Sequence, residues 1–321
     1  MSKKYPFDNM LLYNSDKYCR QIASINHGKN AKYFIETLGC QMNEADSEQL
    51  AGMLTDMGYS ETEDISSADI IVINTCCVRE NAEFKLYGHI GELKALKQNN
   101  KDLLIVLCGC MMQQSHVVDK IKKSYKQIDI VFGTHNRQEF PKLLFDRINK
   151  GKKVYDIWEE SIGIAENVPV KRKSAVTAYV PVTYGCDNFC SYCIVPYVRG
   201  REHSRHPESI KNDIVKLAAE GIKEITLLGQ NVNSYNFGMG FADLLYYISD
   251  IRGIERIRFM TSHPKDLSDN LIKAMAEIPE ICSHIHLPLQ SGSSRVLQQM
   301  NRKYTKEQYL MLIDKIRASV K

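Results

Sequence analysis

The sequence has no long hydrophobic run. Its amino terminus carries no apolar segment of the signal-peptide type, and no stretch is long enough to span a bilayer. These two absences argue against a secreted or membrane-embedded protein and predict a cytoplasmic one. Because cytoplasmic thiols stay reduced, the ten cysteines are not expected to form structural disulfides. A cytoplasmic chain with this many cysteines indicates metal binding.

The chain also has little net charge, +4 over 321 residues, and 44% of its side chains are hydrophobic. It can therefore bury a large core, most simply in two domains. The positive charge is concentrated in residues 171–211, which form either a solvated basic face or a surface for a polyanion such as RNA. The cations are Lys171, Arg172, Lys173, Arg199, Arg201, Arg205 and Lys211, and the anions are Asp187, Glu202 and Glu208.

Three cysteines lie close together in Gly-Cys186-Asp-Asn-Phe-Cys190-Ser-Tyr-Cys193. Thiolates at this spacing can hold three irons of a cubane iron–sulfur cluster and leave the fourth iron open to a ligand from outside the protein. Zinc is the alternative. It would need a fourth protein ligand, and no second close cysteine pair follows, although His203 or His206 could supply a nitrogen.

The first half of the chain repeats a βαβα pattern. Residues 1–30 are polar, have no clean period and are interpreted as an extension. Residues 31–160 are predicted to form an α/β domain with a doubly wound parallel sheet. Its strands are expected at 33–38, 70–74, 103–107 and 128–132, and its helices near 45–57, 81–97, 116–123 and 137–149.

Cysteines follow three of these predicted strands. Cys40 comes after the first, Cys76 and Cys77 after the second, and Cys108 and Cys110 at the end of the third. The carboxyl ends of parallel strands share one edge of the sheet, where ligands bind. Thiols from three strands at one edge predict a second metal centre. The spacing does not decide which cysteine of each adjacent pair is the ligand.

A linker is expected at 161–176, and alternation resumes in residues 177–321 with the rhythm of a β/α barrel. This segment falls short of the roughly 250 residues of a closed barrel. We therefore predict a partial, truncated barrel, an open four-stranded sheet that stops at a helix-to-strand junction. Its strands are expected at 178–182, 224–228, 256–260 and 284–289, and its helices near 207–220, 241–251, 268–277, 294–300 and 306–318.

These motifs carry a resemblance to a known family. The motif Cys186-x3-Cys190-x2-Cys193 after the first strand of a partial barrel resembles that of the radical S-adenosylmethionine enzymes. Nearly the whole chain is similar to the methylthiotransferases, through Thr-Leu-Gly-Cys40-Gln-Met-Asn, Asn-Thr-Cys76-x-Val-Arg79, Gly-Cys110 and Leu-Leu-Gly-Gln-Asn231-Val-Asn-Ser-Tyr235. Two further segments resemble the branch that modifies isopentenylated adenosine in tRNA, namely Cys193-Ile-Val-Pro-Tyr-Val-Arg-Gly-Arg201-Glu and Val-Arg-Glu-Asn-Ala-Glu83. His203 departs from that branch, which usually has Arg there.

The resemblance implies two [4Fe-4S] clusters and S-adenosylmethionine. The open iron of one cluster would bind S-adenosylmethionine and yield a deoxyadenosyl radical, and the auxiliary cluster would supply sulfur. No catalytic side chain is assigned outside the cluster ligands. The ligands would be Cys186, Cys190 and Cys193 in the barrel, and Cys40, Cys76 and Cys110 in the first domain, which leaves Cys19, Cys77, Cys108 and Cys282 unassigned. Cofactor contacts are expected from Tyr192, from Gly229, Gln230 and Asn231 after the second barrel strand, and from Gln290 and Ser291 after the fourth.

The function implied is methylthiolation of carbon 2 of isopentenylated adenosine at position 37 of tRNA, next to the anticodon. The resemblance also implies an electron donor of the flavodoxin or ferredoxin type, a monomer, and further barrel strands and a tRNA-binding β-domain that these 321 residues lack. One alternative is the same chemistry on threonylcarbamoyladenosine of tRNA or on a ribosomal protein. Another is a non-catalytic iron–sulfur or zinc protein that binds RNA.

Overall fold

The computed structural model describes residues 10–77 and 82–321. The chain forms two compact units that divide between Lys171 and Arg172. Arg79, which belongs to one of the family motifs, lies outside the described residues, as does the expected start of a helix at residue 81. Among the described helices, none combines the length and the apolar character needed to cross a membrane.

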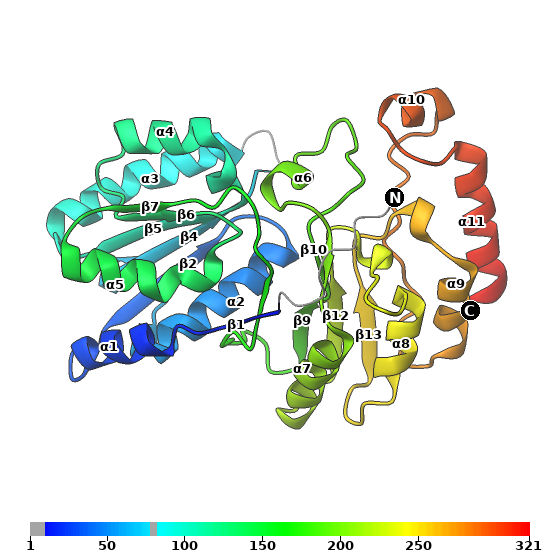
Figure 1. Ribbon diagram of the computed structural model, residues 1–321, viewed down its shortest axis with the longest axis horizontal. Coiled ribbons are helices and arrows are strands. Elements are labelled where there is room, and N and C mark those ends of the chain that lie inside the picture. The colour runs from blue at the N-terminus through cyan, green and yellow to red at the C-terminus, as the bar shows by residue number, and fades with distance from the viewer. Residues whose placement is uncertain (1–9, 78–81) are drawn as a thin grey trace. The chain divides into compact units, whose positions relative to one another are not determined.

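The first unit is built on a parallel sheet (Figure 1). Its described part has six strands in the order β3-β2-β4-β5-β6-β7, and β1 pairs separately with β8. The strands are β1 (Met10–Leu12), β2 (Lys32–Thr37), β3 (Ser60–Glu61), β4 (Ile70–Thr75), β5 (Leu104–Gly109), β6 (Ile130–Phe132), β7 (Val154–Asp156) and β8 (Ile164–Glu166). The helices are α1 (Asp16–Asn26), α2 (Gln41–Asp56), α3 (Ala82–Asn99), α4 (Ser115–Ser124) and α5 (Phe140–Lys150), with 3₁₀ turns η1 (Ile65–Ser67), η2 (Cys110–Gln113) and η3 (Arg137–Glu139).

Helices cover both faces of this sheet (Figure 1). Helices α1, α2 and α5 pack on one face, where Val72 and Phe132 are buried, and α3 and α4 pack on the other, over Ile73 and Leu107. Successive strand residues point to opposite faces, so a continuous apolar strand such as Ile70–Thr75 contributes to both cores. The predicted doubly wound parallel sheet is confirmed.

The amino-terminal residues and the sheet edges add elements that the pattern did not predict. The segment interpreted as an extension contains β1 and α1, and Cys19 and Ile22 of α1 are buried in the core beside α2 and α5. The strands β3 and β7 are two and three residues long. A period of two cannot be recognised in so few residues, so strands this short have no sequence signature.

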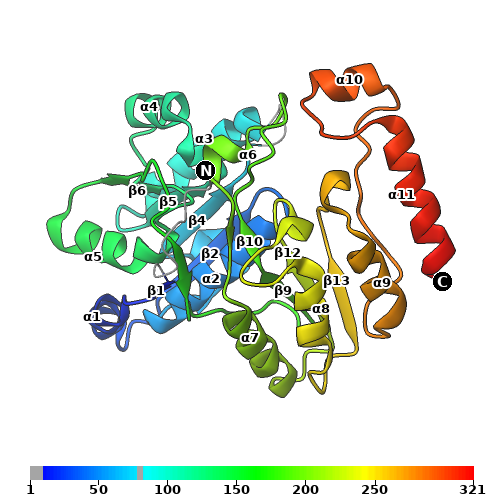
Figure 2. The same cartoon turned by 45° about the vertical axis from the view of Figure 1, so that its right-hand side comes forward.

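The second unit has a three-stranded parallel sheet in its described part, in the order β13-β12-β9 (Figure 2). Helices α7, α8 and α9 cover it through Ile214, Leu245 and Ile272, and α11 packs beside α9. Parallel strands with helices outside them are the arrangement of a partial β/α barrel, as predicted. The strands are β9 (Thr177–Pro181), β10 (Thr183–Tyr184), β11 (His203–Ser204), β12 (Glu224–Leu228) and β13 (Arg256–Phe259). The helices are α6 (Val195–Val198), α7 (Pro207–Ala219), α8 (Phe241–Ser249), α9 (Asp269–Glu277), α10 (Ser294–Gln299) and α11 (Lys306–Ser319), with 3₁₀ turns η4 (Val232–Ser234) and η5 (Pro264–Asp266).

The prediction of a fourth barrel strand at 284–289 is wrong. The chain meets β13 only at an isolated bridge between Ile257 and Ile281, and then runs on as a loop. A single further backbone bond joins Ser262 N to His286 O at 3.0 Å. Pro288 has no N–H to donate to a ladder, which helps to explain why the pairing does not continue.

Candidate metal centres and cofactor site

Three cysteines lie at the carboxyl edge of the sheet in the first unit. Cys40 follows β2 and caps α2, Cys76 follows β4, and Cys110 begins η2 directly after β5. Because β2, β4 and β5 are neighbours in the sheet, the three cysteines lie at one edge. Cys76 and Cys110 are buried, whereas Cys40 is exposed.

The side chain of Asn43, in the first turn of α2, joins these cysteines. Its Oδ1 accepts hydrogen bonds from the thiols of Cys40 and Cys110, at 3.6 and 4.0 Å. Its Nδ2 donates to the carbonyl of Thr75, the residue before Cys76, at 2.9 Å. Two of the three predicted ligands of the first unit therefore contact one buried amide, and the third, Cys76, directly follows the residue whose carbonyl that amide binds.

Gly39 allows β2 to end close to β4. Its φ of +146° lies in a region that L side chains rarely adopt. A Cβ at this position would lie 2.7 Å from the Cβ of Cys76 and 3.1 Å from Cγ of Asn43. The close approach that sets Cys40 beside Cys76 therefore depends on the absence of a side chain at residue 39.

Replacing Asn43 by alanine is expected to lower the free energy of unfolding by about 2–4 kcal/mol, because buried hydrogen-bonding groups lose their partner. Urea-induced unfolding measures this loss. The matched control is Asn149→Ala at the exposed end of α5, for which a change within about 0.5 kcal/mol is expected. Equal effects of the two substitutions would contradict the role given to Asn43.

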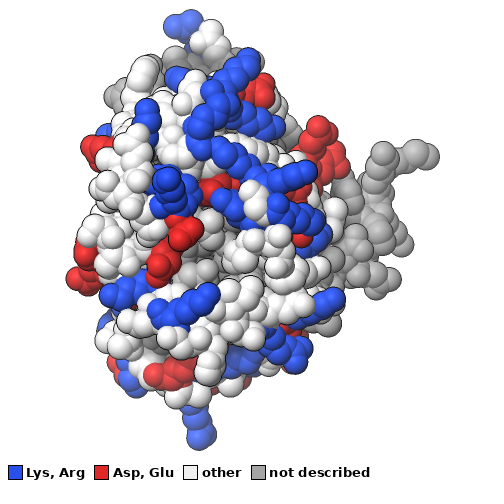
Figure 3. Space-filling model, turned by 90° about the vertical axis from the view of Figure 1, so that its left-hand side faces the viewer, with Lys and Arg blue, Asp and Glu red and all other residues white. Residues whose placement is uncertain are grey.

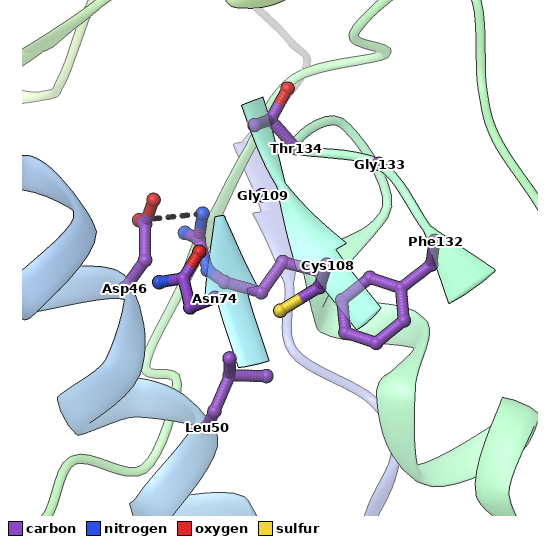
Figure 4. A pocket seen from close by; sticks show the side chains of 9 residues that line it. Asp46, Leu50, Asn74, Cys108, Gly109, Phe132, Gly133 and Thr134 are labelled. Atoms are coloured by element: carbon purple, nitrogen blue, oxygen red, sulfur yellow. Dashed lines mark ion pairs between the residues drawn. The ribbon is translucent and has the colours of Figure 1, made fainter. Parts of the chain in front are cut away.

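Cys108 lies in the core beneath α2 rather than with the candidate ligands (Figure 4). Burial raises the pKa of its thiol. A small gap adjoins it, lined by Leu50 and Phe132 and by an ion pair of 2.8 Å between Asp46 and Arg137. The free space is about that of one water molecule, far less than a small-molecule site needs. Cys108 is therefore a core thiol beside a minor packing gap.

The second cysteine group lies in a loop between β10 and α6. Gly185 starts it with a φ of +74°, and a Cβ there would lie 2.1 Å from a backbone oxygen of the returning chain. Within the loop, Cys193 N donates to Cys190 O at 2.9 Å. Cys186 and Cys190 are each 8% exposed. The glycine turn and this bond fold the three cysteines into one compact loop.

The three thiols of this loop lie within electrostatic reach of one another. Burial raises the pKa of Cys186 to about 11, and the charges of Cys193 and Cys190 act in the same direction. Burial also raises the pKa of Cys193, with Cys190 again acting in the same direction. Metal binding favours the thiolate form, so buried thiols that repel one another as anions are stabilised by a shared cluster. The loop fits a cluster held by three cysteines.

One residue beside this loop was missed by the sequence analysis. Arg302 Nη1 lies 3.4 Å from the sulfur of Cys190 and 3.4 Å from the hydroxyl oxygen of Tyr192. Arg302 and the cysteine loop are far apart in the sequence, and no short motif links them. Only the fold makes this contact visible.

The predicted cofactor contacts Gly229 and Gln230 follow the second barrel strand and lie against the chain that follows the first. Gln230 Oε1 accepts a hydrogen bond from Gly185 N at 2.6 Å, which ties this segment to the cysteine loop. A Cβ at Gly229 would lie 2.1 Å from Thr183 Oγ1, so the glycine is needed for this approach. Tyr192 is 51% exposed and is placed by its contact with Arg302.

Three buried oxygens near these residues have no hydrogen-bond partner within the described part of the chain. They are Thr183 Oγ1, Asn231 Oδ1 and Ser262 Oγ, and each side chain is at most 3% exposed. All three lie just beyond the carboxyl ends of β9, β12 and β13, respectively. Buried polar atoms normally have partners, so these oxygens favour a polar ligand at this edge. The edge fits the S-adenosylmethionine that the motif implies.

The predicted contacts Gln290 and Ser291 lie in a loop rather than at the end of a strand, because the fourth strand is absent from the described residues. Gln290 has a φ of +70°. Ser291 Oγ accepts a hydrogen bond from Ser293 N at 3.2 Å, which stabilises the turn into α10. Their role toward a cofactor stays a prediction.

Glu202, which follows the cysteine loop, has a strongly perturbed carboxyl group. Burial raises its pKa to about 7, and Asp187 and Asp266 act in the same direction. The pKa of this carboxyl group is higher in the folded than in the unfolded chain. Its contribution to the free energy of unfolding is therefore complete below pH 4.5, and it is lost as the pH rises through about 7.

Replacing Glu202 by glutamine is therefore expected to raise the free energy of unfolding by about 3 kcal/mol at pH 8 and by much less at pH 4.5. Urea-induced unfolding at the two pH values measures the difference. An effect of the same size at both would show that the carboxyl group is not responsible.

One of the two histidines considered as zinc ligands, His206, has another role. His206 Nδ1 accepts a hydrogen bond from Glu208 N at 3.2 Å and caps α7, and its ring packs on Phe237. In the part of the chain that the structure describes, no three His, Cys, Asp or Glu side chains converge as ligands of one metal ion. A structural zinc site needs such convergence. In a cubane cluster each thiolate binds a different iron, so the cysteines need not meet at one point.

Comparisons with known proteins agree with this arrangement. Residues 32–133 match a family described as "Uncharacterized protein family UPF0004", and residues 180–321 match the "Radical SAM superfamily". Similar curated proteins are tRNA-2-methylthio-N(6)-dimethylallyladenosine synthases of Acetivibrio thermocellus, 55% identical over 92% of this chain, and of Clostridium tetani, 53% identical over 93%. The chain spans 62% and 67% of the length of these two relatives.

Solved structures are similar in fold alone. A radical S-adenosylmethionine methyltransferase from Kitasatospora setae superposes with a TM-score of 0.60 at 15% identity, over 90% of this chain and 66% of the other. A cobalamin-dependent S-adenosylmethionine radical enzyme superposes with a TM-score of 0.58 at 14% identity, over 92% of this chain and 49% of the other.

The fold, the cysteine loop and the matched families define the class as a radical S-adenosylmethionine protein with an additional amino-terminal α/β domain. That class implies S-adenosylmethionine and one [4Fe-4S] cluster. Within it, the chain belongs to the family of the tRNA-2-methylthio-N(6)-dimethylallyladenosine synthases.

Proposed function

We propose that this chain carries the radical and sulfur-donor centres of an enzyme that methylthiolates carbon 2 of isopentenylated adenosine at position 37 of tRNA. S-adenosylmethionine would serve as radical source and methyl donor. A [4Fe-4S] cluster would be held by Cys186, Cys190 and Cys193, and an auxiliary cluster held elsewhere in the chain would supply the sulfur. The printed names of relatives about 55% identical to this chain support the activity and the substrate.

The observation that carries this proposal is the placement of Cys40, Cys76 and Cys110 at one edge of the sheet, where Asn43 contacts two of them and the residue before the third. Radical generation alone needs one cluster, and a second group of three cysteines at a strand edge supports an auxiliary cluster that would donate sulfur. A thiolate-rich edge partly closed to water also suits a cluster, because burial and hydrogen bonds to sulfur tune its potential.

Carbon 2 of adenine carries a hydrogen that no side-chain acid or base of the protein can remove. Cluster-bound S-adenosylmethionine supplies the radical chemistry for this step. The protein would hold the cluster through its three cysteines and would offer the unpaired oxygens of Thr183, Asn231 and Ser262 to polar groups of the cofactor. Gln230 fixes the cysteine loop against that edge through Gly185 N.

A group of exposed lysines that suits RNA lies on the first unit. In the predicted basic segment, Arg199 and Arg205 are buried, and Arg205 pairs with Asp213 at 2.8 Å. The face in Figure 3 instead gathers lysines at the carboxyl ends of α4 and α5 and in the loops that follow them. The exposed lysines of these segments are Lys122, Lys123, Lys126, Lys150, Lys152 and Lys153. Those in the helix ends also complement the helix dipoles, but the loop lysines favour a polyanion such as the tRNA backbone.

Nucleoside analysis distinguishes this substrate from the related ones. Bulk tRNA from cells that lack the gene is expected to contain isopentenyladenosine without its methylthio group, as measured by mass spectrometry. Normal methylthio-isopentenyladenosine, with loss of the methylthio group from threonylcarbamoyladenosine or from a ribosomal protein, would contradict the proposal.

A non-catalytic RNA-binding protein is the alternative from another class. Protein expressed from the complete gene and reconstituted with iron and sulfide is expected to convert S-adenosylmethionine to 5′-deoxyadenosine when dithionite is added. A protein that only binds RNA makes none. We also propose a flavodoxin or ferredoxin as the physiological electron donor, a monomeric state and a cytoplasmic location.

The structure divides the chain after Lys171. The domain boundaries expected at residues 30, 160 and 176 stay predictions. Further barrel strands and a β-domain that binds tRNA are likewise proposed from the family resemblance. Limited proteolysis tests the boundaries, since cleavage is expected in exposed connecting segments.

A further inference from the structure

Arg302 carries a positive charge that is buried beside the cysteine loop. Its side chain follows α10 and is 9% exposed. Besides its contacts with the Cys190 sulfur and the Tyr192 hydroxyl, Nε donates to the hydroxyl of Tyr304 at 3.1 Å and Nη2 to the carbonyl of Pro288 at 3.4 Å. The guanidinium is thus held on several sides.

None of the hydrogen bonds of this guanidinium within residues 10–77 and 82–321 goes to a carboxylate. Its oxygen partners are two phenols and a carbonyl, all neutral groups. A buried charge without an opposite charge costs several kcal/mol, and such charges are normally paired. A cluster bound in this loop would place a thiolate sulfur at Cys190, in contact with the guanidinium.

Arg302 is also fixed to the cysteine loop by the backbone around it. Asn301, at a φ of +55°, donates through Nδ2 to Phe189 O at 2.9 Å. Ser191 N donates to Met300 O at 3.1 Å, and Ser191 Oγ donates to Gln299 O at 3.0 Å. The segment 299–302 and the loop around Cys190 therefore form one hydrogen-bonded structure, which sets the position of the guanidinium relative to the sulfur.

We propose that Arg302 is the counterion of the cluster held by Cys186, Cys190 and Cys193, and that it acts through the sulfur of Cys190 to favour the reduced cluster. The inference rests on the proposed function in so far as that function places a cluster in this loop. Adding an electron makes the cluster more negative, so a fixed cation that donates to a ligand sulfur stabilises the reduced form more than the oxidised form. Arg302 is a positioning residue, because it acts through a ligand.

The test is a redox titration of this cluster followed by electron paramagnetic resonance, in protein carrying Cys76→Ala so that only one cluster contributes. Arg302→Gln is expected to keep its iron and to lower the equilibrium constant for one-electron reduction at least tenfold, which is a shift of about 59 mV to more negative potential. Arg302→Lys, which keeps the charge, is expected to shift less. The matched control is Arg295→Gln at an exposed position of α10, which is expected to leave the potential unchanged.

Each other outcome also decides the question. An unchanged potential in Arg302→Gln, with weaker binding of S-adenosylmethionine, would assign the guanidinium to the cofactor and overturn the proposal. Loss of iron from Arg302→Gln but not from Arg302→Lys would support a need for the charge. Loss of iron from both variants would show that the shape of the side chain matters rather than its charge, and would overturn the proposal. If the protein with unchanged Arg302 gives no cluster signal, the proposed function itself fails.

Discussion

Replacing Cys190 by alanine is expected to reduce the formation of 5′-deoxyadenosine from S-adenosylmethionine to background. With one of its three thiolates gone, the cluster in the barrel loop loses the ligand set that leaves a single iron open. The proposed auxiliary cluster would be held by cysteines of the other unit and is expected to stay. Iron should therefore fall from about eight to about four atoms per anaerobically reconstituted chain.

The matched control for this variant is Cys282→Ala. Cys282 lies in the same unit, is partly exposed and is not a candidate ligand. Its replacement is expected to leave iron content and 5′-deoxyadenosine formation unchanged in protein expressed from the complete gene. Full activity of the Cys190 variant, or an equal loss in both variants, would refute the assignment of this loop.

Replacing Cys76 by alanine is expected to abolish methylthiolation and to spare the cleavage of S-adenosylmethionine. Cleavage of S-adenosylmethionine should continue, because the barrel loop is intact, while methylthiolated adenosine falls below detection because the sulfur donor is lost. Iron is again expected to fall to about four atoms per chain. The product is measured by mass spectrometry of tRNA after incubation with the variant.

The adjacent cysteine provides the control. Cys77 is partly exposed and stands one residue beyond Cys76, the residue that directly follows the strand. Cys77→Ala is expected to retain both reactions and the full iron content. If Cys77→Ala abolished methylthiolation and Cys76→Ala did not, the ligand of this pair would have been assigned to the wrong residue.

Much of the fold could be predicted from periodicity. Strands such as Ile70–Thr75 are short, continuous apolar runs rich in β-branched residues, and this length and composition favour a buried strand. The error at residues 284–289 has a physical origin. That segment is apolar enough to resemble a strand, but its pairing with β13 stops after one bridge, and Pro288 cannot donate.

The candidate ligands could also be predicted, because thiols that recur at strand ends and at close spacing are typical of metal sites and are rarely placed there by core packing alone. The groups that surround them could not. Asn43 and Arg302 each act on a cysteine through the fold, and an isolated Asn or Arg in a sequence has no distinctive pattern. Conversely, the basic segment at 171–211 was visible as a run of charges, yet Arg199 and Arg205 of that run are buried.

The bonds between segment 299–302 and the cysteine loop also bear on how the protein matures. During synthesis, Cys186, Cys190 and Cys193 leave the ribosome more than a hundred residues before Asn301 and Arg302 do. Until that later segment arrives, Ser191 and Phe189 lack the partners that hold the loop in shape. Loading of iron into this centre is therefore expected to follow translation rather than accompany it, and the three thiols await their metal in an incompletely ordered nascent chain.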